Sequence, residues 1–419
     1  MLERAFSHPS RCSTSTSVTS LLRQSSILVR SKAVIYGHSM KFRSGRASLV
    51  GAVVIFGAIL GACGASSAGK PKATTDVNPT GISIASGSLL TMVAPNGGRF
   101  EAIDCASAGN CTAVGHDGES PGSVANPIYA VETQGRWNSV IELAGPGGSG
   151  GLSGVSCPLA DGCAVVGFSN SGAWADRESN GNWASPQIQQ SLLTGGFNAV
   201  DCPTEKGCTA VGISSSVDGT QVTAKFVQGA WEDPLVSSEV GQFSGVSCWS
   251  TFHCAVVGSS ASGASGEFDA SDGTSRPLDL SGPSRGVLTS VKCIVQGHCV
   301  AVGYDYDSGV PLYVQQNGDT WTESTTNSST RGGLDGLSCV SAQQCIAVGS
   351  DNNQSGKVSA VAVRMTNGKW GPVVKLPLRG IEILTAVSCK SASRCTAVGY
   401  TSGGQGTPQQ PVVVSLSLP

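Results

Sequence analysis

The stretch Leu288–Gly303 reads LTSVKCIVQGHCVAVG, and this pattern occurs seven times along the chain. Every copy starts with Leu or Phe, has a Cys five positions later and a second Cys after five more residues, and closes with Val-Gly. The copies begin at Phe100, Leu152, Phe197, Phe243, Leu288, Leu334 and Leu384. Their first cysteines are 45 to 52 residues apart, a period that matches a propeller blade and exceeds most helical repeats.

Each repeat contains enough apolar runs for a four-stranded sheet. The two runs beside the cysteines are joined by a short polar turn, which predicts a hairpin. A third run follows, such as Leu312–Val314, and a glycine turn then leads to a Trp that opens an outer strand, as in Gly318–Trp321. The repeat that starts at Phe243 has Gly273-Thr274-Ser275 in place of this turn, so we predict that its blade is the least regular.

The two ends of the repeat region complement each other. The seventh repeat ends after its third run, Pro411–Leu416, and therefore lacks an outer strand. The stretch Gly87–Val93 precedes the first repeat at the spacing of an outer strand, with Leu89 in the Trp position. We expect this N-terminal strand to complete the last blade, because closure protects strand edges. The sequence thus predicts an all-β, seven-bladed β-propeller of four-stranded blades over residues 81–419.

The cysteine pattern predicts one short disulfide in every blade. An exported protein with paired cysteines forms disulfides, and each small ring contributes roughly 2 kcal/mol. Zinc is the alternative, since His253 and His298 adjoin cysteines, but zinc sites favour other spacings and cysteines that converge on one point. We expect no metal and no cofactor. The predicted pairs are Cys105–Cys111, Cys157–Cys163, Cys202–Cys208, Cys248–Cys254, Cys293–Cys299, Cys339–Cys345 and Cys389–Cys395.

The N-terminal part predicts export and lipid anchoring. From Met40, a basic segment precedes the apolar run Ala47–Leu60, which is shorter than the roughly 20 residues of a spanning helix. Leu60–Cys63 (LGAC) resembles a bacterial lipobox, so we assign residues 40–62 to a signal peptide and Cys63 to lipidation. The alternative is an uncleaved anchor with an incidental Cys. We interpret residues 1–39 as a start codon placed too early, and residues 63–80 as a flexible tether.

Charge excludes one class of partner. Residues 1–62 hold eight of the 26 basic side chains and one of the 28 acidic ones, which leaves the rest of the chain with a net charge of −9. Nucleic-acid binding needs clustered Lys and Arg, and this part of the chain has no such cluster. We expect a monomer at the outer face of the cell membrane, with an envelope protein or an anionic glycan as its partner.

The repeat resembles the Asp-box propellers, which include sialidases and non-enzymatic surface proteins, and the VSCPSAxxCxAVG repeats of exported actinobacterial proteins. The resemblance covers about residues 87 to 419. Only Gly318–Trp321 keeps half of the Asp-box motif, and Gln316 stands where the motif has Asp. The resemblance implies either a non-catalytic binding propeller or a sialidase-like glycan hydrolase with an Arg cluster, a Tyr–Glu nucleophile pair and an Asp acid. No sequence motif places the catalytic groups, so we favour the non-catalytic function.

The candidate binding residues are arginines that enter the innermost strands of consecutive blades. The loops before blades five, six, seven and one carry Arg285, Arg331, Arg379 and Arg99, and Tyr304 and Tyr400 follow two of the Ala-Val-Gly segments. These four consecutive blades form one arc of the ring, which we call the arginine arc. Arg pairs well with carboxylates and phosphates, which predicts an anion site on this arc. Pairing of these arginines with acids such as Asp335 and Glu382 is the alternative. Asp305–Gly309 is interpreted as a solvated turn rather than a calcium loop.

The lipobox assignment makes the first testable prediction. Replacement Cys63→Ser removes the predicted acylation site, and we expect the several acyl chains on this residue to hold the protein at the membrane. We expect the variant to appear in the soluble fraction or to remain unprocessed at higher mass, as measured by fractionation and mass spectrometry. Unchanged membrane retention and unchanged mass would contradict the assignment.

Overall fold

The computed structural model describes residues 81–118, 124–147, 149–189, 195–215, 219–270, 272–280, 286–325, 330–352, 358–378, 382–401 and 407–419. The chain divides into two units, Met1–Lys72 and Ala73–Pro419, and all described residues belong to the second. The predicted signal peptide, Cys63 and the tether lie outside the described residues. No helix in the described segments is long and apolar enough to cross a membrane.

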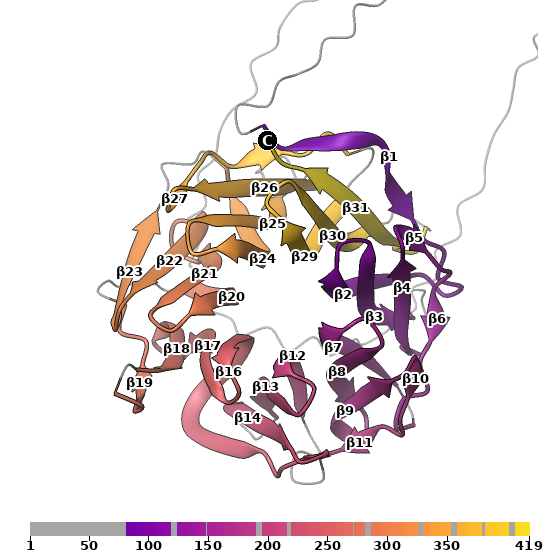
Figure 1. Cartoon of the computed structure of the whole chain (residues 1–419), viewed down its shortest axis with the longest axis horizontal. Coiled ribbons are helices and arrows are strands. Elements are labelled where there is room, and N and C mark those ends of the chain that lie inside the picture. The colour runs from indigo at the N-terminus through magenta and orange to yellow at the C-terminus, as the bar shows by residue number, and fades with distance from the viewer. Residues whose placement is uncertain are drawn as a thin grey trace, which may run out of the picture. The chain divides into compact units, whose positions relative to one another are not determined.

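The described residues form a ring of seven antiparallel blades, and hydrogen bonds join three of these blades into one sheet, so the ring contains five sheets (Figure 1). The predicted all-β, seven-bladed propeller is therefore confirmed. Blade one contains β2 (Gly98–Ser107), β3 (Asn110–Asp117), β4 (Pro127–Thr133), β5 (Arg136–Trp137) and β6 (Ile141–Glu142). Blade two contains β7 (Gly150–Leu159), β8 (Gly162–Ser169), β9 (Gly172–Ser179), β10 (Asn182–Trp183) and β11 (Gln187–Ile188). Blade three contains β12 (Gly195–Thr204), β13 (Gly207–Ser214), β14 (Thr220–Val227) and β15 (Ala230–Trp231).

The remaining blades follow the same plan. Blade four contains β16 (Leu235–Ser250), β17 (His253–Ser260), β18 (Gly263–Asp269) and β19 (Ser275–Pro277). Blade five contains β20 (Gly286–Val295), β21 (His298–Asp305), β22 (Pro311–Asn317) and β23 (Thr320–Thr325). Blade six contains β24 (Gly332–Ser341), β25 (Gln344–Asn352), β26 (Val358–Thr366), β27 (Lys369–Trp370) and β28 (Val374–Lys375). Blade seven contains β29 (Glu382–Ser391), β30 (Arg394–Thr401), β31 (Pro411–Ser417) and β1 (Ser83–Thr91).

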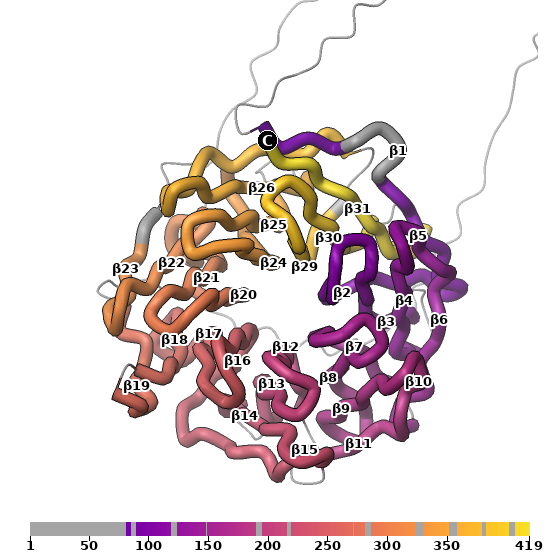
Figure 2. The backbone as a smooth tube through the Cα atoms, viewed as in Figure 1, coloured from indigo at the N-terminus to yellow at the C-terminus, as the bar shows by residue number. Residues whose placement is uncertain are grey.

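The N-terminal strand closes the ring as predicted. Strand β1 pairs with β31, so the first strand of the described chain lies beside the last one (Figure 2). The predicted place of Leu89 is wrong. In the five blades that have the Trp, it pairs with the residue opposite the second Cys. In blade seven that residue is Leu416, whose partner is Ile84. A register shift between Ile84 and Leu89 moves Leu89 to Val414, which spacing alone cannot reveal.

A bulge in every innermost strand explains the invariant glycine at the end of the repeat. In blade five the register shifts between Leu288 and Ser290, opposite Gly303. A Cβ on Gly303 would lie 1.9 Å from the carbonyl oxygen of Val287, and the other six closing glycines meet the equivalent oxygen at 1.8 to 2.1 Å. Only glycine fits at this close approach, and the bulge turns the extra residue, Thr289 in this blade, toward the axis.

Each of the seven C-x5-C pairs forms a disulfide inside its own blade, between the innermost strand and the next one. In most blades the two cysteines are direct partners in the ladder, as are Cys389 and Cys395. The sulfurs are buried and belong to the apolar clusters that lie between neighbouring blades. The bridges therefore hold each inner hairpin together, while contacts between blades must hold the ring.

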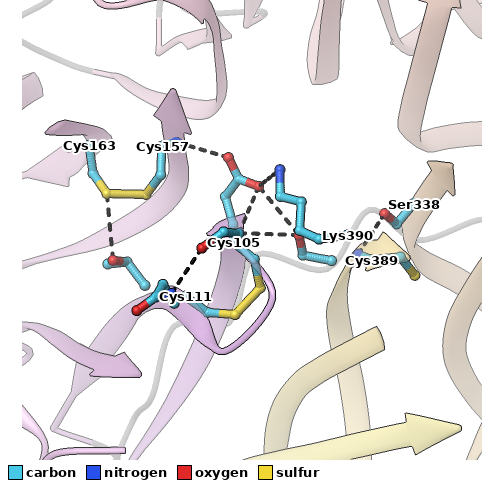
Figure 3. Close-up of a disulfide and its surroundings, with 12 residues drawn as sticks. Cys105, Cys111, Cys157, Cys163, Ser338, Cys389 and Lys390 are labelled. Carbon is cyan, nitrogen blue, oxygen red and sulfur yellow. Dashed lines mark hydrogen bonds and ion pairs between the residues drawn. A yellow bond between two sulfur atoms is a disulfide. The ribbon is translucent and has the colours of Figure 1, made fainter. Parts of the chain in front are cut away.

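One hydrogen bond recurs between neighbouring blades, and we call it the junction bond. The side chain before the first Cys of a blade accepts the backbone N–H of the first Cys in the next blade. Figure 3 shows it between Ser338 and Cys389, where the two atoms are 3.0 Å apart. The other five run from Cys157 to Asp104, Cys202 to Ser156, Cys248 to Asp201, Cys293 to Ser247 and Cys105 to Ser388. Blade five has Lys292 at this position, and an ammonium group cannot accept a hydrogen bond.

Blade four differs from the others as the sequence suggested. Its outer strand β19 starts at Ser275, in the position of the Trp, and its innermost strand β16 is unusually long. The first part of β16 pairs with β14 of blade three, and the second part pairs with β17. Together with a bridge between Gly196 and Phe168, this sharing joins blades two to four into one continuous sheet.

The junction bond makes a prediction about stability. Replacement Ser338→Ala leaves the buried N–H of Cys389 without its acceptor, which costs roughly 1–3 kcal/mol of unfolding free energy. We expect this loss in chemical denaturation of the oxidised protein. Ser250→Ala, at an exposed serine, is the matched control and should change the unfolding free energy by less than about 0.5 kcal/mol. Equal effects of the two replacements would contradict the importance of the junction bond.

Candidate functional site

A cavity of about 220 Å³ lies on the axis of the ring, lined by the innermost strands of all seven blades. The small residues Ala102, Gly154, Ala199, Gly245, Ser290, Gly336 and Ala386 line it at equivalent positions. Their size is set by the close approach of adjacent blades, since a Cβ on Gly336 would lie 2.5 Å from the Cα of Ala386. The cavity is therefore narrow because the blades pack tightly around it.

The bulges place one polar side chain per blade on the cavity wall. These residues are Glu101, Ser153, Asn198, Ser244, Thr289, Asp335 and Thr385. Three of them donate to the backbone of the following blade, from Asn198 to the Phe243 oxygen at 2.7 Å, from Thr289 to the Leu334 oxygen at 2.5 Å, and from Thr385 to the Phe100 oxygen at 2.8 Å. Three members of the polar ring thus tie blades together, and two other members are carboxyl groups.

Glu101 is the carboxyl group with cationic and hydrogen-bonding partners. Nε of Arg99 donates to its Oε1 at 2.5 Å, and Nε2 of His116 lies 3.5 Å from the same oxygen. Burial alone would raise the pKa of Glu101, but the hydrogen bond with His116 and the charge of Arg99 lower it on balance. Glu101 is therefore ionised at neutral pH and neutralised locally by Arg99.

Asp335 is the carboxyl group for which the described residues provide no such partner. Burial, followed by repulsion from Glu101, raises the pKa of Asp335 to about 7. The residue lines both the central cavity and a second pocket on the rim. A proton is therefore gained or lost near neutral pH at the point where the two cavities meet.

The position before the first Cys forms a second polar ring along the same strands. Attraction to Asp201, opposed by burial and reinforced by Asp104, raises the pKa of Lys292. Asp104 also lies 3.7 Å from Nζ of Lys390 and accepts the N–H of Cys157. The acids on this ring face fixed partners, so they offer little free charge to a ligand.

The rim pocket lies at the junction of blades five and six. It has a volume of about 390 Å³ and is lined by Tyr304, Tyr306, Arg331 and Asp335, together with the backbone of Gly332 and Gly333. The two tyrosine rings meet edge to face at 4.8 Å, and their hydroxyl oxygens are 3.3 Å apart. Tyr306 and Arg331 are exposed, and no described residue forms an ion pair with Arg331. The pocket therefore offers a guanidinium group and a phenol pair to solvent.

The predicted arginines have different environments. Arg331 and Tyr304 line one pocket, as the arc hypothesis requires. Arg99 binds Glu101 and stacks over Tyr400, with 5.4 Å between its Cζ atom and the ring centre, so its charge is already satisfied. Arg285 and Arg379 lie outside the described residues, and their part of the arc stays a prediction.

Sequence reasoning missed the two polar rings and the coupling of Asp335 to Glu101. The signal was present, because the second residue of the repeat and the residue before the first Cys are polar in every copy. Strand alternation alone predicts which residues share a face, whereas the bulge that turns the second residue inward has no sequence motif of its own. No three His, Cys, Asp or Glu side chains gather as a metal site within the described segments.

Comparison with known proteins finds the fold among solved structures only. No family model matches the chain, and no curated protein matches it. YCF48 bound to a D1 peptide has a TM-score of 0.52 and 11% identity, over 79% of this chain and 95% of that chain. YCF48 from Cyanidioschyzon merolae has a TM-score of 0.49 and 14% identity, over 79% and 98%. A subtype N11 neuraminidase-like protein has a TM-score of 0.42 and 9% identity, over 80% and 94%. At such identities the likeness to the first of these shows the propeller fold alone.

The raised pKa of Asp335 makes a prediction about pH. The folded state keeps a proton up to about pH 7 that the unfolded chain releases near pH 4, so stability falls as pH rises between these values. Asp335→Asn should reduce this fall, to which Asp176 with its pKa raised to about 6 also contributes, and should stabilise the protein at pH 8 on the order of 2 kcal/mol. Unfolding free energies at pH 5 and pH 8 measure it, with the exposed Asp279→Asn as control. An unchanged pH profile in Asp335→Asn would contradict the assignment.

Proposed function

We propose that this chain is an exported, lipid-anchored binding propeller that takes up a carboxylate-bearing polypeptide segment at its rim pocket. The observation that carries the proposal is the combination of Arg331 and the Tyr304–Tyr306 pair around one open pocket. An exposed guanidinium group offers paired donors to a carboxylate, and the phenol rings offer flat contact area of low conformational entropy.

The volumes of the two cavities favour the rim pocket over the axial cavity as the ligand-binding site. The rim pocket, at about 390 Å³, lies in the roughly 300–1,000 Å³ range of ligand sites, and the axial cavity, at about 220 Å³, lies below it. Asp335 at the inner end of the rim pocket can donate a hydrogen bond when protonated and attract a cation when ionised. A segment with both an acid and a polar or basic neighbour would satisfy both ends of the pocket. A propeller of the same fold, YCF48, has been solved with a peptide, which supports a protein ligand as the class.

Glycan hydrolysis is the second candidate, and one observation favours it. A carboxyl group with a raised pKa beside an ionised one is the arrangement used by many glycosidases. Against it, Glu101 is bound by Arg99 and His116, and no Tyr is among the described residues that line the axial cavity. The binding function accounts for the rim pocket without requiring these carboxyl groups to react.

Binding measurements with Arg331→Gln test the proposal. Loss of a charge-assisted contact predicts a roughly 10- to 100-fold weaker affinity for acidic peptides at low salt, with a smaller difference at high salt. The matched control is Arg136→Gln, at an exposed arginine of the outer strand β5. The double replacement of Arg285 and Arg379 by Gln reports whether the predicted arc extends beyond Arg331.

Three outcomes would contradict the proposal. The first is equal peptide affinity in Arg331→Gln and in the control. The second is selective binding of acidic envelope glycans in place of peptides, which would change the ligand class. The third is hydrolysis of a fluorogenic sialoside that Asp335→Asn abolishes, which would make the chain an enzyme.

A further inference from the structure

The outer position that holds a Trp in five blades holds Ser275 in blade four. In blade three, Trp231 pairs with Phe226, which in turn pairs with Cys208. In blade four the N–H of Cys254 donates to Asp269, and Asp269 pairs with Ser275. The register of the two blades is therefore the same, and an indole ring is replaced by a hydroxymethyl group.

The Trp side chains pack in the grooves between neighbouring blades, and three of them meet an aromatic ring of the preceding blade. Trp183 meets Tyr129 of blade one with 5.5 Å between ring centres, and Trp321 meets Phe268 of blade four at 5.8 Å. Trp370 meets Tyr313 of blade five at 4.8 Å. The Nε1 atoms of Trp183, Trp231, Trp321 and Trp370 are buried without a hydrogen-bond partner. The grooves thus hold the indole ring through packing alone, without a hydrogen bond to its Nε1 atom.

Without a Trp, the groove between blades three and four is open. A cavity of about 440 Å³ lies there, with Ser275 at its mouth and Phe243, Val256 and Phe268 among its walls. Val256 is 8% exposed, whereas the equivalent residues of the other six blades are fully buried. Those six residues are Ala113, Val165, Ala210, Ala301, Ala347 and Ala397, all at 0%. The groove therefore has a small polar side chain where its equivalents have a ring, and its wall keeps slight exposure at Val256. A cavity of about 720 Å³ also lies beside Trp231 in the groove between blades two and three, so what distinguishes blade four is the vacant Trp position and not the open volume alone.

An apolar strand edge borders this cavity. Leu235, Val236 and Val240 in the first part of β16 are 71%, 51% and 41% exposed, and the first two also line the cavity. This part of β16 pairs with β14 on one side, and among the described strands none pairs with its other side. Figure 1 shows it as a long ribbon on the outer circumference. Large exposed apolar residues on an unpaired edge are typical of a surface that another strand covers.

We propose that the cavity between blades three and four binds an aromatic side chain, of the Trp type, carried by an extended segment of a partner protein that adds to the free edge of β16. The chemistry of the occupant is given by the repeat itself, because five equivalent grooves hold an indole ring. Lys225 lines the same cavity, with its Nζ 5.4 Å from the centre of the Phe252 ring, so a cation is in place beside an inserted aromatic face. The site is separate from the rim pocket and does not depend on the function proposed for it.

Two soluble peptides test the proposal on the mature, oxidised protein. Both are strand-forming hexapeptides of Thr and Val, one with a central Trp and one with Ser in its place. We expect the Trp peptide to bind at least 10-fold more tightly than the Ser peptide, as measured by calorimetry. N-acetyltryptophanamide, which has the ring without the strand, should bind at least 10-fold more weakly than the Trp peptide.

Variants of the cavity and its edge separate the contributions. Ser275→Trp fills the cavity from within, so it should raise the melting temperature by several degrees and reduce the affinity for the Trp peptide to that for the Ser peptide. Ser275→Ala is the matched control and should bind like the original chain. Val236→Asp adds a charge to the exposed edge without touching the closed interior, and should weaken the Trp peptide at least 10-fold, even if Ser275→Trp fails to fold.

Three results would contradict an aromatic binding site between blades three and four. Equal affinity for the two peptides, or unchanged Trp-peptide binding by folded Ser275→Trp, would show that the cavity takes no aromatic side chain. Equal affinity for the peptide and for N-acetyltryptophanamide would remove the strand edge from the site. Dimerisation that Ser275→Trp abolishes would make a second copy of this chain the occupant, in place of a foreign partner.

Discussion

The whole ring depends on how each innermost strand is tied to the next. Apolar clusters pack neighbouring blades against each other, which buries the backbone N–H groups near the axis, so these groups need acceptors across the junctions. The junction bond does this by using a side-chain oxygen of one blade for a backbone N–H of the next. Ser388 and Thr385 form such hydrogen bonds between blade seven and blade one. The ring is therefore closed by these bonds as well as by the pairing of its first and last strands.

The same geometry limits where a ligand can bind. The bulges turn polar residues inward, but Asn198, Thr289 and Thr385 use their hydrogen bonds on the neighbouring blade. Small residues at the next position let the strands approach, which leaves a narrow axial cavity. Open volume therefore lies away from the axis, at the rim and in the grooves between blades two and three and between blades three and four.

Most of the fold follows from the sequence, because a repeat of fixed length with paired cysteines allows few architectures. The period, the missing last strand and the C-x5-C spacing were sufficient for the blades, the closure and the disulfide pairs. Leu89 was misplaced because an irregular strand has extra residues that pattern matching counts as regular ones. The site was predicted less well. Arg331 and Tyr304 share a pocket, but the pairing of Arg99 with Glu101 depends on a bulge, which periodicity does not show.

The junction between blades five and six combines two departures from the repeat. Lys292 replaces the acceptor of the junction bond, and the rim of the same junction opens into the pocket of Tyr304 and Arg331. Thr289 replaces part of the lost connection, since it donates a hydrogen bond to the Leu334 oxygen across this junction. Lys292 itself is attracted to Asp201 of blade three and Asp104 of blade one. This junction therefore keeps one of the two hydrogen bonds, from the bulge residue, whereas the junctions from blade three to four and from blade seven to one have both. The rim pocket therefore lies at the junction whose hydrogen bond comes from the bulge residue in place of the residue before the first Cys.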